Sequence, residues 1–402
     1  MDIVIFEDNK TEQLFPLAEL RPGFEIKAGA FSIREKTGKL FSGKNVKYHT
    51  REILKNYAAE LYGIENIFEQ CSGVTLFLNG KVVFAKSAAG IFPEKNNELI
   101  KSGDDIIAFT SSDTKTALDI IYGNPIPPDM KVTDITDNKS FHILNYTWDA
   151  VRYFEEDLNY DLEYMFDNTD ARIFRQDFDT NKIRLHENAD ILPNVVLDSS
   201  KGKIFIEEGA MVEPFCYIRG PVYIGKKTLI KSGTKIYGPA NIGYASRVAG
   251  EISGTNFHSY INKQHSGFIG NSYVCEFANL GADTVTSNLK NNYSEIRTSL
   301  PFSDDSYKTG MQFLGSIIGD HSKTGINTML NTGSIIGIFS NIAGGGFPDK
   351  LIDSFQWYIS GREPSRYKIE EALATARKVM SRRDVQMSGA YESLVREIYN
   401  IK

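Results

Sequence analysis

The sequence predicts an α/β domain, a parallel β-helix and a C-terminal helical segment, in that order along the chain. Three observations predict this arrangement. Short apolar runs alternate with helix-like stretches in the first half, aliphatic residues recur every six positions in the second half, and an amphipathic stripe follows near the C-terminus. These patterns divide the chain into residues 1–185, 186–348 and 349–402.

Composition excludes several classes of protein. The 402 residues are 41% hydrophobic and 24% charged, which is ordinary for a globular protein of two or three domains. A net charge of −6 argues against a general nucleic-acid binder. No apolar run approaches the ~20 residues that span a bilayer, and the acidic start is unlike a signal peptide. Three scattered cysteines indicate no disulfide framework. We therefore expect a cytoplasmic protein with no nucleic-acid partner and no membrane span.

The first 185 residues read as alternating strands and helices. Apolar runs predict strands at residues 3–6, 74–78, 82–85 and 106–109, and helices are expected over 51–62 and 148–166. Such alternation is typical of an α/β domain with a largely parallel sheet. Acidic residues gather on the last helix, and we interpret them as a solvated helix face rather than a metal site. They are Glu155, Glu156, Asp157, Asp161, Glu163, Asp167 and Asp170.

A period of six dominates the middle of the chain. Neither an α-helix nor a plain strand repeats every six residues, whereas a parallel β-helix does. Three hexads make one triangular coil of about 18 residues, with each aliphatic side chain pointing inward. The repeating residues are Ile206, Val212, Ile218, Ile224, Ile230, Ile236, Ile242 and Val248.

The repeat is interrupted twice. Its phase breaks near Gly254, which predicts a loop leaving the prism over 254–266, and a polar stretch over 287–316 predicts a second, longer excursion. Between them the stretch is rephased on Phe268, Val274 and Leu280. The step of six resumes at Ile318, Thr324, Leu330, Ile336 and Ile342. Loops of this kind are where a solenoid carries function, because the side chains of the coils are committed to packing.

The C-terminal segment carries one apolar stripe and a cluster of cations. The stripe predicts a helix that packs through one face. It consists of Ile369, Leu373, Ala376 and Met380. We interpret the cations as a solvated face that complements the helix C-terminus rather than as a phosphate site. They are Arg377, Lys378, Arg382 and Arg383.

The segment from His265 to Asn288 resembles the acetyltransferase half of the bifunctional bacterial family that makes UDP-N-acetylglucosamine. It combines His265-Ser266-Gly267-Phe268-Ile269-Gly270 with the run from Asn279 to Asn288, and the interval matches without a gap. The stretch from Leu20 to Lys36, and His321 to Thr328, are similar to a divergent sugar nucleotidyltransferase branch of that family. The resemblance implies a nucleotidyltransferase-like (Rossmann-like) first domain, a left-handed β-helix, and a homotrimer with acyl-CoA sites between subunits.

The same resemblance implies the residues of an acetyltransferase site. His265 is the expected general base, because transfer to a sugar amine requires a group that accepts the amine's proton near neutral pH. Asn279 and Asn288 are expected to contact the sugar and the acyl donor, and Lys290 is a candidate for the sugar phosphate. Acetyl-CoA is the implied co-substrate.

The sequence departs from the family pattern in this segment. Phe268 stands where the family has tyrosine, so one hydroxyl contact to the sugar is lost, and Asp283 replaces a glycine. The preceding loop is shorter than in the family. Its phosphate-binding cations therefore have no aligned counterparts, and Arg247 and Lys263 are nearby candidates.

The nucleotidyltransferase half departs further. No Gly-rich loop follows the first strand, although backbone N–H groups of such a loop usually cradle the triphosphate. Arg21 and Lys36 could supply the two cations that meet the triphosphate of UTP or dTTP. Asp104 and Asp105, at the head of a strand, could hold Mg²⁺, and a simple turn at a strand edge is the alternative.

The function predicted from these features is a sugar-1-phosphate nucleotidyltransferase fused to an acetyl-CoA-dependent hexosamine-1-phosphate N-acetyltransferase. One alternative is a monofunctional enzyme with a vestigial half. Another is a zinc-dependent β-helix lyase of the carbonic anhydrase type, since His258, His265 and His321 all lie in the repeat region. A non-catalytic regulatory trimer is the fourth possibility.

Overall fold

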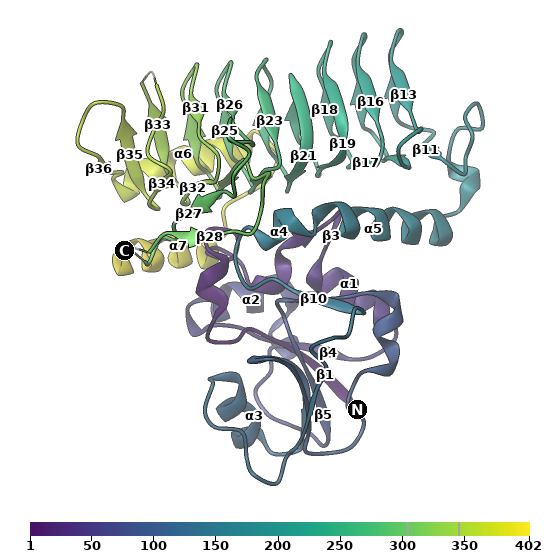
Figure 1. Cartoon of the computed structure of the whole chain (residues 1–402), viewed down its shortest axis with the longest axis vertical. Helices are drawn as coiled ribbons and strands as arrows, with labels where there is room; N and C mark the ends of the chain where they lie inside the picture. The colour runs from purple at the N-terminus through teal and green to yellow at the C-terminus, as the bar shows by residue number, and fades with distance from the viewer. Residues whose placement is uncertain (304, 345) are drawn as a thin grey trace.

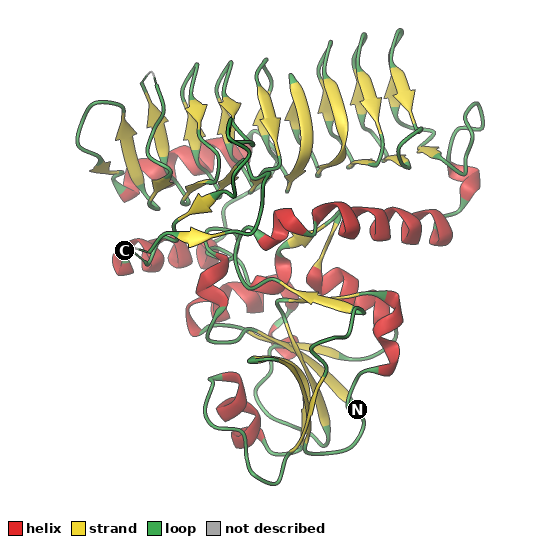
Figure 2. Cartoon of the chain, viewed as in Figure 1, coloured by secondary structure: helices red, strands yellow, loops and turns green. Residues whose placement is uncertain are grey.

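A long β-solenoid forms one side of the molecule, and the N-terminal domain projects from it (Figure 1). The computed structural model describes residues 1–303, 305–344 and 346–402. Figure 2 shows the solenoid as stacked strands, with helices between it and the N-terminal domain, along its flank and within the N-terminal domain itself. The predicted order of α/β domain, parallel β-helix and C-terminal helices is confirmed. Within the described part of the chain, no helix is both long and apolar enough to traverse a bilayer.

The N-terminal domain is built on a mixed six-stranded sheet. Its strands, in spatial order, are β4 (Val46–His49), β1 (Asp2–Phe6), β5 (Thr75–Asn79), β8 (Asp105–Ser111), β7 (Glu98–Ser102) and β9 (Lys131–Asp134). The expectation of a largely parallel sheet was wrong in part, because β8 runs antiparallel to both neighbours. The reason is local: only Gly103 and Asp104 separate β7 from β8, and so short a connection permits only a hairpin.

Helices and short ladders surround this sheet. The helices are α1 (Ile33–Leu40), α2 (Lys55–Tyr62), α3 (Thr114–Ile121), α4 (Asp149–Arg152) and α5 (Phe154–Asn168). The small ladders pair β2 (Lys27–Ala28) with β3 (Phe31–Ser32) and β6 (Val82–Phe84) with β10 (Phe141–Ile143). Helix α1 begins at a capping box in which Ser32 and Glu35 satisfy each other's backbone N–H groups.

Two long parallel ladders and several short ones make the solenoid. The first contains β11 (Ile183–Leu185), β14 (Ile204–Ile206), β17 (Val222–Ile224), β19 (Lys235–Ile242), β21 (Glu251–Phe257), β24 (Tyr273–Val274), β29 (Ser316–Ile318), β32 (Ser334–Ile336) and β34 (Leu351–Ile352). The second contains β12 (Asp190–Ile191), β15 (Met211–Val212), β18 (Leu229–Ile230), β20 (Arg247–Val248), β22 (Asn262–Lys263), β25 (Asn279–Leu280), β30 (Lys323–Thr324), β33 (Asn341–Ala343), β35 (Gln356–Ile359) and β36 (Ser365–Arg366). The third side includes β13 (Val196–Asp198), β16 (Tyr217–Arg219), β23 (Phe268–Gly270), β26 (Val285–Thr286) and β31 (Met329–Leu330).

The aliphatic repeat is the core of this solenoid, as predicted. All eight residues from Ile206 to Val248 at the six-residue step are completely buried and belong to one apolar cluster. In the rephased stretch the cluster takes Ile269 rather than Phe268, which is only half-buried. The register there differs by one residue from the expectation, so Phe268 faces outward.

The first expected excursion does not exist. Residues 254–266 stay within the coils, since β21 and β22 pair on both sides with neighbouring strands. The break of phase has another cause, which is a short coil: Arg247 is paired with Asn262, only 15 residues later, whereas Leu229 and Arg247 are 18 apart. The repeat therefore changes phase because this coil is shorter than the one before it, and not because a loop is inserted.

The second expected excursion is confirmed. Tyr273 is paired with Ile317, 44 residues later, and the intervening chain leaves the prism. It carries the hairpin of β27 (Arg297–Thr298) and β28 (Tyr307–Lys308). Arg152 of α4 donates to the carbonyl of Thr309, so the excursion returns against the N-terminal domain.

Two C-terminal helices flank the solenoid, α6 (Ile369–Ser381) and α7 (Gly389–Ile401). The predicted stripe on α6 is buried at Leu373, Ala376 and Met380, while Ile369 is half-buried. These helices cover a corner of the solenoid where five rings stack along successive coils. The stacked rings are Tyr260, Phe277, His321, Phe339 and Phe355.

The N-terminal domain is fixed to the solenoid by buried polar contacts as well as by apolar packing. Arg21 forms ion pairs with Asp320 and Glu276, two corner residues of the solenoid. Ser354 donates to the buried carboxylate of Glu19 at 2.9 Å. The backbone N–H of Lys27 donates to the Tyr273 hydroxyl at 2.9 Å. The two parts therefore share one interface.

Candidate functional site

His265, the predicted base, lies exposed at a corner of the solenoid between β22 and β23. The corner is fixed from two sides. Ser266 donates to the Asp283 carboxylate on the next coil, and the amine of Lys263 donates to the carbonyls of His265 and Ser266 at 2.9 and 3.1 Å. The backbone is therefore held while the imidazole stays open to solvent, so that it can accept a proton from a ligand.

Lys263 differs from its expected role as a phosphate contact. It is paired with Val248, an inward-facing position, and its side chain is completely buried. Burial lowers the pKa of its amine to about 8, with only weak opposition from Asp283. The structure thus corrects the prediction: the amine supports the corner from inside the prism.

Three other predicted contacts have local partners of their own. Phe268 and Asn288 crowd against Gly270, where an added Cβ would meet the Asn288 amide nitrogen at 2.7 Å. The Asn288 amide donates to Asn271 at 2.8 Å. Lys290 lies in the excursion, where its amine donates to the carbonyl of Glu295 at 2.7 Å. The substrate contacts of these three residues stay predictions.

A row of polar side chains crosses the second ladder of the solenoid. The parallel register places Arg247, Asn262, Asn279 and Lys323 on neighbouring strands at equivalent positions. Asn262 donates to Asn279 at 2.6 Å and accepts from Gln264 at 2.5 Å. Gln264 is the residue before His265, so the row leads to the candidate base.

This row forms one wall of a groove of about 220 Å³, and the end of α6 forms the other. Four cations line it, and no acidic residue is among the described residues that do. Burial lowers the pKa of Lys323 to about 8. Burial, together with Arg247 and Arg382, also lowers the pKa of Arg383. Cations held together without a partner acid require an anion to offset their repulsion.

The groove involves one predicted cluster and one residue that was missed. Arg382 is exposed, as expected for a solvated helix face, and together with the half-buried Arg383 it lines the groove beside Arg247. Lys323 was missed altogether, because the excursion hides its register with Asn279. Aligning the hexads on either side of 287–316 would have found it.

A second cavity, of about 400 Å³, opens at the carboxyl end of β1. Ligands of open α/β sheets bind outside the carboxyl ends of the strands, so this is the expected place for a nucleotide. Asp8, Lys10, Asp104 and Asp105 line it, together with Lys101. Sequence analysis identified the two aspartates but not the cations.

The residues of this cavity do not fit a resident Mg²⁺ ion. Asp105 already lies 3.0 Å from the amine of Lys10 and 2.9 Å from that of Lys81, so two ammonium groups stand where a metal would bind its carboxylate. Both lysines lower the pKa of Asp105 more than burial raises it. Asp104 lies in the hairpin turn, exposed, and within the described ranges no cluster of three metal-binding side chains occurs.

Arg21 and Lys36 do not reach this cavity. Lys36 is 5% exposed, and its amine lies 2.5 Å from Asp161 and 3.7 Å from Asp157 on α5. These two carboxylates are therefore buried, contrary to the expected solvated face. Arg21 faces the solenoid. Contact of Arg21 or Lys36 with a triphosphate stays a prediction. Such contact would require the ion pair of Arg21 with Asp320, or that of Lys36 with Asp161, to open.

The three histidines of the zinc alternative are separated. His321 stacks between Phe277 and Phe339, and burial lowers its pKa to about 3. His258 lies 3.1 Å from Glu276. His265 lies exposed on another corner. Within this described chain they form no common metal site.

Comparison with known proteins bears first on the N-terminal domain. Residues 3–169 match the family model described as sugar nucleotidyl transferase. The parallel β-helix follows the matched residues.

Two curated relatives are named as bifunctional proteins. The chain is 30% identical over 150 residues to a bifunctional sugar-1-phosphate nucleotidylyltransferase/acetyltransferase of Sulfurisphaera tokodaii, covering 35% of each chain. It is 29% identical over 182 residues to the bifunctional protein GlmU of Methanococcus vannielii, covering 44% of this chain and 40% of that one. The matches thus span well under half of these relatives.

Two solved structures are similar to part of the chain. A putative acetyltransferase from Bacillus cereus covers 53% of this chain and 97% of its own, at 14% identity and a TM-score of 0.28. PerB from Caulobacter crescentus, solved with CoA and GDP-perosamine, covers 46% of this chain and 57% of its own, at 10% identity and a TM-score of 0.13.

Proposed function

We propose that the protein makes a nucleotide-activated, N-acetylated sugar, using a sugar-1-phosphate nucleotidyltransferase domain and a β-helix acetyltransferase domain. The observation that carries the proposal is the exposed His265 corner beside the cationic groove, in a chain whose first domain matches sugar nucleotidyl transferases. The zinc alternative has no such support, since the three histidines lie apart.

The acetyltransferase half combines a base with an anion site. In the proposed reaction the amine of a hexosamine 1-phosphate attacks the acetyl carbonyl of acetyl-CoA, and the imidazole of His265 accepts the amine proton. The thiol of CoA leaves. The groove of Arg247, Lys323, Arg382 and Arg383 takes phosphate groups of one substrate, because it offers cations without acids.

The nucleotidyltransferase half uses the cavity at the carboxyl end of β1. There Lys10 and Lys101 provide charge for a triphosphate of UTP or dTTP, in place of the missing Gly-rich loop. Catalysis of such transfers is mostly positioning and charge offset. Because Asp8 and Asp105 are paired with lysines, no step of the proposal runs through Mg²⁺.

We also propose a homotrimer in the cytoplasm. The trimer is supported by the resemblance of the β-helix segment to acetyltransferases that form their sites between subunits. The location is supported by three cysteines that are all free.

A substrate panel tests the proposal. Hexosamine 1-phosphates are mixed with acetyl-CoA, and hexose 1-phosphates with each nucleoside triphosphate, with and without Mg²⁺. Free CoA thiol and pyrophosphate are followed separately. Release of both CoA thiol and pyrophosphate supports two active halves. Release of only one of them identifies a monofunctional enzyme. Release of neither favours the non-catalytic regulatory trimer.

A further inference from the structure

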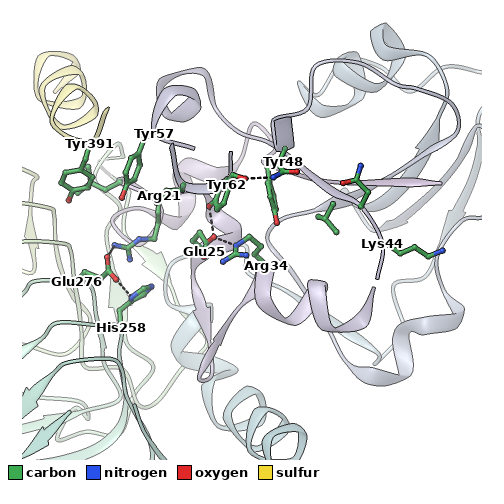
Figure 3. A pocket seen from close by; sticks show the side chains of 15 residues that line it. Arg21, Glu25, Arg34, Lys44, Tyr48, Tyr57, Tyr62, His258, Glu276 and Tyr391 are labelled. Atoms are coloured by element: carbon green, nitrogen blue, oxygen red, sulfur yellow. Dashed lines mark hydrogen bonds and ion pairs between the residues drawn. The ribbon is translucent and has the colours of Figure 1, made fainter. Parts of the chain in front are cut away.

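One cavity lies apart from both the His265 corner and the cavity of Asp105, although the predicted cation Arg21 lines it. It has a volume of about 600 Å³ and lies where the N-terminal domain, the solenoid and α7 meet. Figure 3 shows side chains from all three parts converging on it: Arg21 and Tyr57 from the first, His258 and Glu276 from the second, and Tyr391 from the third. Its size lies within the range of small-molecule sites.

Three buried nitrogens in its wall have no hydrogen-bond partner among the described residues. They are Nη1 of Arg21 and both ring nitrogens of His258, and each residue is 8% exposed. Buried donors and acceptors are nearly always satisfied in folded proteins, so unsatisfied nitrogens in a cavity wall indicate a ligand or ordered solvent. The Tyr57 hydroxyl on the same wall likewise has no hydrogen bond within the described structure.

The carboxylate of Glu276 orients His258. Nδ1 of the ring lies 3.1 Å from Oε1 of Glu276, as the dashed line in Figure 3 marks. Burial raises the pKa of Glu276, but His258 and Arg21 outweigh it and lower that pKa to about 2. This contact holds one edge of the imidazole against the carboxylate and leaves the other ring nitrogen, Nε2, without a partner among the described residues.

The wall therefore presents a guanidinium donor and a ring nitrogen, both without partners among the described residues. A hydroxyl group suits both, because it accepts from Arg21 and can either donate to or accept from the imidazole nitrogen. A phosphate or carboxylate only accepts, and the Glu276 carboxylate beside it would repel it. Tyr48, Tyr57, Tyr62 and Tyr391 supply flat, amphipathic surface around the space.

We propose that this cavity binds the hydroxylated ring of a sugar, through hydrogen bonds to Arg21, His258 and Tyr57. The exposed amine of Lys44, also on the lining, lies on the part of the wall away from the solenoid (Figure 3). A phosphate or nucleotide attached to the ring finds its charge partner there. The site is separate from the His265 corner and from the cavity of Asp105, so the proposal does not depend on either activity.

Titration calorimetry on the full chain tests this proposal. The probes are glucosamine, glucosamine 1-phosphate and UDP-N-acetylglucosamine, which separate a free ring from its phosphorylated and nucleotide-linked forms. The variants are His258→Ala and Tyr57→Phe. Tyr57→Phe removes one hydroxyl oxygen that makes no hydrogen bond within the described structure. We therefore expect this variant to fold even if His258→Ala does not. Variants Lys378→Ala and Lys115→Ala, both exposed and outside all three cavities, are the controls.

We expect at least one probe to bind with an affinity that falls about tenfold or more in both cavity variants, as for loss of a buried hydrogen bond, and not in the controls. Binding that neither cavity variant weakens places the sugar elsewhere and overturns the proposal. Absence of binding by all three probes also overturns it. Product release measures the transferase activities separately, so either idea can fail alone.

Discussion

Arg21 and Asp320 form a buried ion pair between residues 299 positions apart in the chain. Asp320 also accepts from the backbone N–H of Glu276 at 2.9 Å, so one carboxylate joins the N-terminal domain to two coils of the solenoid. Desolvation raises the pKa of Asp320 despite the nearby guanidinium of Arg21. The pair is therefore costly to break from one side.

Asp320→Ala should destabilise the protein by about 3–5 kcal/mol, because it leaves the guanidinium of Arg21 buried with a weakened set of partners. Urea unfolding followed by tryptophan fluorescence measures the change. Asp170→Ala, which breaks an exposed pair with Arg172, is the control and should leave the midpoint unchanged. Equal midpoints for the two variants would show that the interface does not depend on this pair.

Gly29→Ala should also destabilise the protein. Gly29 has φ of +88°, and an added Cβ would lie 2.8 Å from the carbonyl oxygen of Asp157 on α5. Gly38, within α1, has nothing within 4 Å of its Cβ position. Gly38→Ala is thus a matched control that should stabilise the helix by about 0.5–1 kcal/mol. If thermal unfolding ranks the two variants the other way, the close contact between the loop and α5 is wrong.

His265→Ala should lower acetyl transfer by about 10²–10⁴-fold, because a general base contributes about that factor. Release of CoA thiol measures it, and pyrophosphate release in the same preparation is the control and should be retained. Acetyl transfer near the rate of the unmodified protein would remove His265 from the mechanism.

Binding of an anion in the groove should take up protons at pH 8. Burial holds the pKa of Lys323 near 8, and a bound anion favours the charged amine, so affinity should fall as pH rises above 8. Calorimetry with CoA in buffers of different ionisation enthalpy measures the uptake. Arg383→Ala should weaken binding, whereas Lys378→Ala on the same helix should not. Binding with no proton uptake and equal affinity in both variants would exclude this groove.

Most of the fold could be predicted from the sequence. The alternation of strands and helices in the first domain and the six-residue repeat in the second are both local patterns. The six-residue step needs no tertiary information, and every repeating residue from Ile206 to Val248 is buried. The false excursion at 254–266 arose because a shortened coil and an inserted loop disturb the phase alike. Only the pairing of Arg247 with Asn262 distinguishes them.

The candidate sites were less accessible from the sequence. Lys36 and Asp161 lie 125 positions apart, and nothing local indicates that they pair in the interior. Lys263 has the charge of a phosphate ligand but occupies an inward position. The cavity around His258 requires three segments to meet, and only the stretch from Leu20 to Lys36 carries a motif.

The most direct test of the proposed function is one coupled reaction. Glucosamine 1-phosphate, acetyl-CoA and UTP or dTTP are incubated with the protein, with Mg²⁺ included, and the products are identified by mass spectrometry. The account predicts a nucleotide diphosphate sugar that carries the acetyl group, and its loss in His265→Ala with the unacetylated sugar phosphate left over. A complete absence of both acetylated and nucleotide-linked products, from a folded protein, would contradict it.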